Sequence, residues 1–191
     1  MVGKILIALV VIVAAFIIVV ATRSAEFHIE RSIAVGAPPA RIFTQVNDLH
    51  AWAAWSPWEK LDPKMERTFT GPPAGPGATY AWKSESGKVG QGRMTIEKSE
   101  APALVVVTLE FIKPFAATNT VTFSFDATTD GTKVTWAMDG HNGFMGKAFA
   151  LLMNMDKTVG GDFERGLVGL KAVAEAALNS AAAVAGGGGP Q

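Results

Sequence analysis

The chain opens with an uninterrupted apolar segment. From Ile5 to Ala21 no residue carries a charge or a hydroxyl group, and neither Gly nor Pro breaks the run. A helix rises about 1.5 Å per residue, so this run spans roughly 26 Å. With its edge residues it approaches the length needed to cross a bilayer core of about 30 Å. We therefore expect residues 1–25 to form an N-terminal transmembrane anchor, with residues 5–22 in the membrane.

A cleaved signal peptide is the alternative for this segment. The apolar region of such a peptide is usually about 7–15 residues long and ends at an A-x-A-like cleavage site. Here the run is longer, and the exit at residues 21–25 matches such a site poorly. Lys4 and the terminal amine lie on one side of the run, and Arg23 and Arg31 lie on the other. From these flanks we expect a single-pass protein with its N-terminus inside and its domain outside the cytoplasm.

After the apolar segment the pattern changes to an alternation of apolar and polar residues. Such alternation is typical of a strand with one buried face. It predicts strands near residues 27–35, 66–70, 78–84, 88–98, 104–111, 118–126 and 132–139. The dipeptide Asp130-Gly131 predicts a hairpin turn between the last two. Clean alternation with short turns indicates antiparallel strands that place one face on a core and the other in water.

Helical spacing appears at both ends of this run of strands. Short helices are expected at residues 40–47 and 49–55, and a further short helix or cap at residues 144–156. Residues 157–178 carry apolar side chains at intervals of three or four, which predicts one long helix. This helix contains four glycines, each of which costs about 1 kcal/mol relative to Ala. We expect them where the helix approaches a curved sheet closely: Gly160, Gly161, Gly166 and Gly169.

The order of elements predicts an α+β domain. A curved antiparallel sheet of about six to seven strands is expected to wrap around the long C-terminal helix, which is the one long amphipathic element available to cover it. This domain covers residues 26–178 and follows the transmembrane helix. Residues 179–191 contain four successive glycines, so we expect a flexible tail there.

Composition narrows the possible functions. The chain has 17 basic and 17 acidic residues and no basic stripe, so a nucleic-acid partner is not expected. Cysteine is absent, which excludes disulfides, thiolate metal sites and cysteine nucleophiles. The histidines, His28, His50 and His141, are far apart in sequence. We expect no metal site and no cofactor.

Several motifs in fixed order resemble the START-related superfamily, also called SRPBCC or polyketide-cyclase-like. They are Arg31-Ser-Ile with residues 37–43 and 46–48, the aromatic segment Trp52 to Trp58, Gly90-x-Gly92 followed by Met94 and Ile96, and the terminal-helix segment Asp162 to Lys171. The resemblance covers residues 26–178 and implies the helix-grip fold. It also implies an apolar cavity between sheet and helix, since members bind lipids, sterols or polyketides, and a few catalyse cyclisation or dehydration.

The resemblance supplies no catalytic signature, so no catalytic residue is assigned. Large aromatic and Met side chains on the expected inner face are candidates for contact with an apolar ligand. The same side chains could instead fill a solid core. The candidate ligand-binding residues are Trp52, Trp55, Trp82, Met94, Phe111, Phe123, Trp136, Met138 and Phe163.

Polar candidates are few. Asp139 and His141 end a strand, and an Asp–His pair suits general base catalysis, although such a pair on a turn more often caps a loop. Four other polar residues are expected to be isolated and solvated: Tyr80, Arg93, Glu110 and Lys113.

Three functions remain open from the sequence. The first is a membrane-tethered binding module for a hydrophobic or amphipathic small molecule. The second is a cyclase-like or dehydratase-like enzyme, which needs an ionisable group inside the cavity. The third is a scaffold that presents a surface to another protein, which predicts a filled interior.

Overall fold

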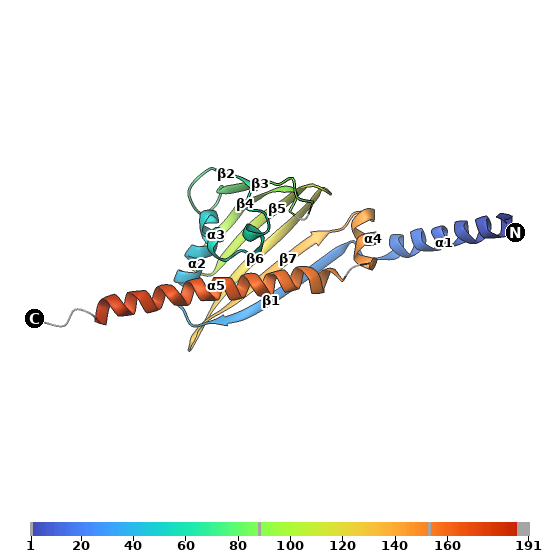
Figure 1. Cartoon of the computed structure of the whole chain (residues 1–191). Helices are drawn as coiled ribbons and strands as arrows, with labels where there is room; N and C mark the ends of the chain where they lie inside the picture. The colour runs from blue at the N-terminus through green and yellow to red at the C-terminus, as the bar shows by residue number, and fades with distance from the viewer. Residues whose placement is uncertain (1, 88, 153, 187–191) are drawn as a thin grey trace, which may run out of the picture.

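A seven-stranded antiparallel sheet forms the centre of the protein (Figure 1). The computed structural model describes residues 2–87, 89–152 and 154–186. The strand order is β1-β7-β6-β5-β4-β3-β2, so every pair except β1–β7 joins neighbours in the sequence. The strands are β1 (Glu26–Val35), β2 (Glu66–Thr70), β3 (Thr79–Lys83), β4 (Gln91–Glu100), β5 (Leu104–Lys113), β6 (Ala117–Thr128) and β7 (Gly131–His141). The α+β helix-grip fold expected from the sequence is confirmed.

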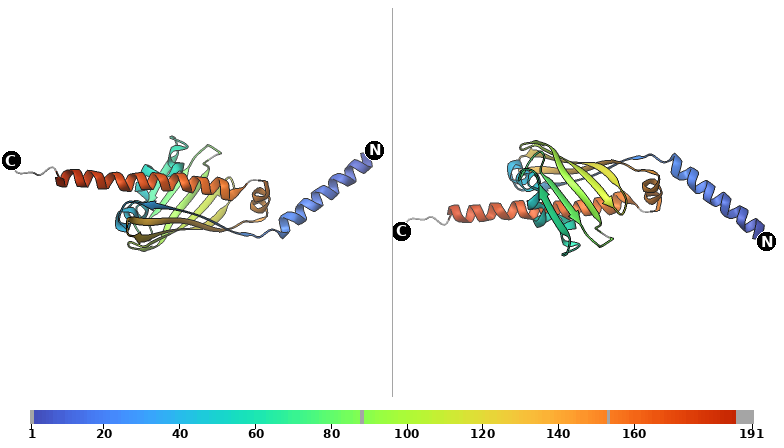
Figure 2. Two further views of the ribbon diagram at one scale, coloured as in Figure 1. Left: turned by 90° about the horizontal axis from the view of Figure 1, so that it is seen from below. Right: turned by 90° about the horizontal axis from the view of Figure 1, so that it is seen from above.

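One long helix lies along the concave face of the sheet, as Figure 2 shows. The helical elements are α1 (Val2–Thr22), α2 (Pro39–Asn47), η1 (Leu49–Ala51), α3 (Trp52–Trp55), η2 (Pro57–Lys60), α4 (Phe144–Leu152) and α5 (Met155–Gly186). The 3₁₀ turns η1 and η2 flank α3, and with α2 they cover the part of the concave face that α5 leaves open. The side chain and carbonyl of Asn154 accept hydrogen bonds from the first turn of α5, from the backbone N–H groups of Lys157 and Thr158.

The C-terminal boundary differs from the expectation. Helix α5 continues to Gly186, into the segment 179–191 that was expected to be a flexible tail. Residues 181–183 and 185 are Ala, the strongest helix former, so the helix continues past the domain. The rest of that segment, like Lys88 in an expected strand and Met153 in the expected cap, lies outside the described residues.

Arg31 fixes the start of α5 to β1. Its Nε donates to Glu164 at 2.8 Å, and its two terminal nitrogens donate to the carboxylate of Asp156 at 3.1 Å. The guanidinium lowers the pKa of the Asp156 carboxyl below its usual range by hydrogen bonding. A side chain at Gly160 would collide with this guanidinium, so the glycine makes room for the ion pairs.

Two further glycines of α5 allow close packing. A Cβ at Gly166 would lie 2.6 Å from the ring of Trp136, and one at Gly169 would lie 2.6 Å from the carbonyl oxygen of Trp55. The expected close approach to the sheet therefore holds at Gly166, while Gly169 lies against α3. Gly161 meets only the tip of Arg165 at 3.7 Å, so no close approach explains it.

Helix α1 projects away from the domain, at the opposite end from the C-terminus (Figure 2). It is the one helix among the described residues that is long and apolar enough to cross a membrane. Almost all of its side chains are exposed, with Val20 as the buried exception. Its last turn meets α4, where the Lys147 ammonium donates to the carbonyl oxygens of Ala21 and Arg23, both at 3.1 Å.

Candidate functional site

A cavity of about 330 Å³ lies between α5 and the half of the sheet nearest α1. Its walls come from every strand except β2, from α3 and η2, and from the first three turns of α5. The lining residues are Phe27, Trp52, Ser56, Trp58, Glu59, Met65, Tyr80, Trp82, Val89, Met94, Leu109, Phe111, Ala117, Asn119, Val121, Trp136, Met138, Asn142, Met155, Val159, Asp162 and Phe163.

The other half of the same interior is solid. There α2 and the middle of α5 close onto the sheet, and the side chains are almost fully buried. They include Val35, Ile42, Val46, Ile96, Val105, Val107, Phe125, Val134, Leu167 and Leu170. The sequence left a pocket and a solid core as alternatives for the inner face, and the structure has one in each half.

Most of the candidate ligand-contact residues lie on the cavity wall: Trp52, Trp82, Met94, Phe111, Trp136, Met138 and Phe163. Two candidates do not. Phe123 is fully buried and sits behind the wall, edge-on to Trp52 at 5.7 Å and to Trp55 at 6.2 Å between ring centroids. Trp55 is held in the solid part because its indole N–H donates to the carbonyl of Gln45 at 3.1 Å. Both residues support the wall from the core side.

An aromatic stack forms the floor of the cavity. The rings of Trp136 and Phe163 are 4.3 Å apart and nearly parallel, at 9°. Trp58 packs edge-on against both, at 5.6 and 6.3 Å. Gly166 allows the Trp136 ring to pack against α5. Gly92 on β4 likewise makes room for the Trp82 ring, because a Cβ at position 92 would collide with the indole. The stack therefore joins η2, β7 and α5 into one rigid apolar surface.

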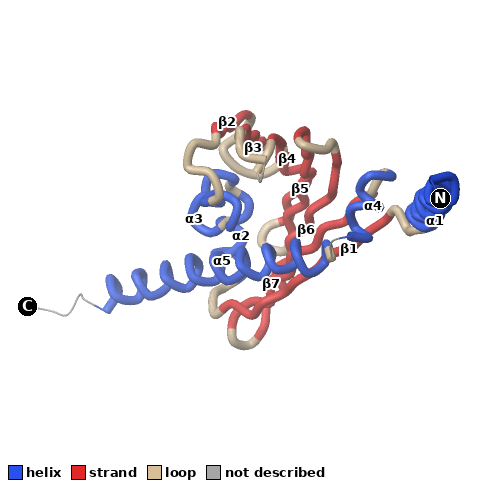
Figure 3. Tube along the Cα trace, turned by 45° about the vertical axis from the view of Figure 1, so that its right-hand side comes forward, coloured by secondary structure: helices blue, strands red, loops and turns tan. Residues whose placement is uncertain are grey.

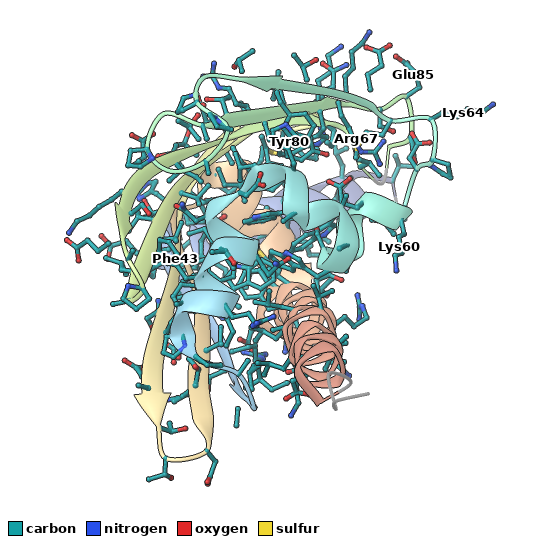
Figure 4. All side chains as sticks on the ribbon, turned by 90° about the vertical axis from the view of Figure 1, so that its left-hand side faces the viewer. Phe43, Lys60, Lys64, Arg67, Tyr80 and Glu85 are labelled. Carbon is teal, nitrogen blue, oxygen red and sulfur yellow. The ribbon has the colours of Figure 1, made fainter. Side chains whose placement is uncertain are left out.

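A polar cluster at one side of the cavity joins the buried Tyr80, the largely buried carboxylate of Glu59 and the exposed Arg67. The Tyr80 hydroxyl donates to Glu59 Oε1 at 2.6 Å, and Arg67 Nε donates to Glu59 Oε2 at 2.7 Å (Figure 4 shows Arg67 and Tyr80 close together). The Glu59 carboxylate is only 9% exposed. Burial and this carboxylate raise the pKa of Tyr80, so the phenol stays protonated. The expectation that Tyr80 is solvated is wrong, because it shares the buried face of β3 with Trp82.

One polar atom of the cavity wall lacks a protein partner. The indole N–H of Trp136 is buried and has no acceptor among the described residues, whereas Trp52 donates to Val46 O at 3.0 Å. A buried donor that gives up water without a new acceptor costs about 1–3 kcal/mol. This N–H is enclosed by the surrounding side chains and remains an unsatisfied donor within the aromatic stack.

The Asp–His pair considered above does not form. Asp139 instead pairs with His28 directly across the β1–β7 ladder, with Nδ1 and Oδ1 at 2.7 Å, and both side chains are more than half exposed. Asp139 raises the pKa of His28 by accepting its hydrogen bond. Arg93 and Glu110 are likewise not isolated, since they pair across β4 and β5 at 2.7 Å. Both pairs lie outside the cavity lining and stabilise neighbouring strands.

Two polar residues of the cavity wall, Tyr80 and Glu59, are not among the residues predicted from the sequence. Tyr80 could have been predicted, because it alternates in phase with Trp82. Glu59 could not, since its role depends on a tyrosine 21 positions later. Within the described ranges, no group of three or more His, Asp or Glu side chains is placed to hold a metal ion.

Comparison with solved structures shows the same fold. A solution structure from Thermobifida fusca aligns with a TM-score of 0.58 at 21% identity, covering 75% of this chain and 90% of that one. The di-domain aromatase/cyclase StfQ of the steffimycin biosynthetic pathway aligns at 0.61 and 10% identity, covering 81% of this chain and 53% of StfQ. Ara h 8.0201 aligns at 0.56 and 15% identity, covering 79% and 99%.

Sequence comparison identifies the family. No curated protein matches the sequence. A family model described as polyketide cyclase / dehydrase and lipid transport matches residues 26–175, which include the whole sheet, the cavity and the part of α5 that packs on them. The resemblance noted in the sequence is therefore confirmed: this chain belongs to the polyketide cyclase / dehydrase and lipid transport family.

Proposed function

We propose that this protein is a membrane-tethered binding module for a hydrophobic or amphipathic small molecule, which it holds in the cavity. The observation that supports the proposal is the cavity in the half of the interior nearest α1. Its volume of about 330 Å³ lies in the range of small-molecule sites, roughly 300–1,000 Å³. Aromatic rings give the wall rigid surfaces, and the methionines at 65, 94, 138 and 155 let it adapt to ligand shape.

The polar atoms of the wall favour an amphipathic ligand. The lining includes the amide side chains of Asn119 and Asn142, a residue type that hydrogen-bonds carbonyl or hydroxyl oxygens. Glu59 already accepts hydrogen bonds from Tyr80 and Arg67 at both of its oxygens, so its charge is compensated within the protein. An apolar molecule with one oxygen-bearing group matches this wall better than a pure hydrocarbon or a cation.

Helix α1 supports the tether. Its length and composition fit a bilayer span, and a signal sequence would pass the same test. The Lys147 ammonium binds the carbonyl groups of Ala21 and Arg23, so a retained α1 is held against α4. The flanking charges favour a domain outside the cytoplasm. Intact-mass measurement of the membrane-extracted protein tests retention, and a mass lacking the first twenty-odd residues would contradict the tether.

Mass spectrometry of bound molecules tests the binding proposal. The full chain is purified into nanodiscs of one synthetic phosphatidylcholine, and organic extracts are compared with those of empty nanodiscs. We expect a discrete apolar species in stoichiometric amount. If no such species appears and added fatty acids, isoprenoids and polyketide-like aromatics all fail to bind, the proposal is wrong. The variant Val121→Phe, which fills the cavity, is the control and should lose the species.

A cyclase-like or dehydratase-like activity is the second candidate, because the wall contains ionisable groups. Glu59 and Tyr80 are the polar pair nearest to acid–base chemistry. Their geometry disfavours it, since Arg67 holds Glu59 as an ion pair and the raised pKa of Tyr80 makes it a weak acid. A pure scaffold is disfavoured by the hollow interior. Turnover of a bound polyketide-like ligand that is lost in Glu59→Gln would favour the enzyme.

A further inference from the structure

Large exposed apolar side chains occur in two groups at one end of the sheet. Ile112 and Phe115 form the tip of the β5–β6 hairpin, and Phe144, Met145 and Phe149 lie on α4. We call these five residues the apolar rim. Their exposed fractions run from 46% to 66%. Outside α1 and this rim, the large exposed apolar side chains of the described residues are scattered singly: Leu61, Phe69 and Val168. A gathered apolar patch marks a site of interaction, whereas single residues do not.

The rim lies at the end of the domain where α1 joins it. The β5–β6 tip and α4 both follow strand ends that meet there, because Phe111 pairs with Ala117 and Asn119 pairs with Gly140 near the end of β7. Helix α4 contacts the last turn of α1, and Lys147 binds its terminal carbonyl groups. Figures 1 and 3 show α4 between α1 and the start of α5. A bilayer that holds α1 therefore lies at the same end of the domain as the rim.

The cavity reaches the surface at this same end. Ala117 is exposed, and Val89, Asn142 and Met155 are half-buried, so the wall meets solvent beside the rim. The opposite wall, at Trp52, Met65 and Met94, is buried under α3 and the sheet. Part of the cavity lining is therefore exposed at the end of the sheet that carries the rim.

The charges of this end are mixed. Arg23, Lys113 and Lys147 lie there, together with the exposed acids Glu26 and Glu85. Lys147 is already engaged with α1. Apolar contact, rather than attraction to anionic lipid, therefore has to supply most of the interaction.

From this arrangement we infer that the apolar rim inserts into the interfacial layer of the bilayer that holds α1, and that ligand passes between that layer and the cavity without crossing water. The inference rests on the proposed function for its tether and its ligand. The occupant of the rim is a lipid surface, and the rim acts as an interfacial anchor in the manner of an amphipathic segment.

Site-directed labels test the insertion. The natural chain has no cysteine, so single variants Phe115→Cys and Met145→Cys can carry an environment-sensitive fluorophore. Thr129→Cys, on the exposed β6–β7 turn at the other end of the sheet, is the matched control. The full-length variants are placed in phosphatidylcholine vesicles with and without lipids that carry a quencher just below the headgroup. We expect blue-shifted emission and several-fold stronger quenching at positions 115 and 145 than at 129.

Each other outcome overturns the inference. Equal, water-like emission at all three positions means that the rim stays in solvent. A blue shift without lipid quenching means that protein covers the rim, for example a second copy of the chain. Because these labels report insertion and not ligand occupancy, the mass-spectrometric test of the proposed function can succeed while this one fails, and the reverse.

Transfer kinetics test the path of the ligand. Phe115→Ser is compared with Leu61→Ser, which removes a similarly exposed apolar side chain away from the rim. With a fluorescent fatty acid dissolved in the vesicles as the probe, Phe115→Ser should slow loading several-fold and leave the equilibrium occupancy unchanged. Loading that is equally fast in both variants, or slowed equally in both, contradicts transfer through the rim.

Discussion

The two halves of the interior are built from the same strands but packed differently. In the half under α2, the buried side chains Ile96, Val105, Phe125 and Val134 of the sheet pack with Leu167 and Leu170 in the middle of α5. In the half nearest α1, β4, β5 and β7 carry Met94, Phe111, Trp136 and Met138, which surround a cavity together with the first turns of α5. The solid half holds the domain together, and the hollow half is free to bind. Substitutions of matched residues in the two halves test this difference.

The largest difference is expected between two phenylalanines. Phe123 is fully buried behind the cavity wall, while Phe111 borders the cavity and is half-buried. Phe123→Ala should lower the free energy of unfolding by about 3–5 kcal/mol, because it opens a new hole in a packed region. Phe111→Ala should cost clearly less, since it enlarges an existing space. Chemical denaturation of the full chain in detergent measures both, and equal losses would contradict the division into halves.

The polar cluster of the hollow half is expected to give the next largest effect. Tyr80→Phe removes the hydroxyl that donates to the buried Glu59 carboxylate. Hydrogen bonds to charged groups contribute about 1.5–3 kcal/mol, so the free energy of unfolding should fall by that amount. In a Glu59→Gln background the same change should cost less, which a double-mutant cycle measures. A loss of equal size in both backgrounds would show that the bond does not matter.

Two valines paired across neighbouring strands are expected to give a smaller change in stability but a clear change in ligand binding. Val107 and Val121 face each other across β5 and β6, yet only Val121 lines the cavity. Val107→Phe should cost about 1–3 kcal/mol of stability through overpacking and should leave ligand affinity unchanged. Val121→Phe should leave stability nearly unchanged and reduce affinity severely. Unfolding and binding titrations on both variants test this prediction. A loss of affinity in Val107→Phe together with a loss of stability in Val121→Phe would show that the cavity does not lie beside Val121.

The smallest effect is expected on the outer face, where both halves are alike. Asp139 raises the pKa of His28, so the protonated imidazole is favoured in the folded protein. This contribution is fully present below the unfolded pKa of about 6.5, and it disappears as pH rises through the higher folded pKa. Both groups are exposed, so the change in stability should be slight. An NMR titration should give a raised midpoint for His28 that returns to the usual value in Asp139→Asn.

Much of the fold follows from periodicity along the chain. Alternation identifies which residues of β4 to β7 share the inner face, because successive side chains of a strand point to opposite sides. The same rule would have placed Tyr80 inward beside Trp82. It could not reveal Glu59, which lies in a short 3₁₀ turn and is recruited by Tyr80 and Arg67 only after the chain folds.

The aromatic segment from Trp52 to Trp58 shows most clearly what periodicity along the chain cannot predict. Trp52, Trp55 and Trp58 lie within seven positions of one another and look equivalent in sequence. In the structure Trp52 and Trp58 line the cavity, while Trp55 supports the core behind it. The rotation of α3 separates Trp52 from Trp55, and α3 is held against α5 by contacts such as the approach of Gly169 to Trp55, while Trp58 lies on the following turn η2.

The apolar N-terminal helix, the antiparallel strands, their inner faces and the long helix that covers them can all be predicted from the amino-acid sequence. These features depend on local periodicity and on the length of apolar runs. Three features depend on tertiary packing: which half of the interior is hollow, which polar groups reach it, and the position of the apolar rim at the same end of the domain as α1. Space between elements depends on how they pack against one another, and packing is a property of residues far apart in the chain.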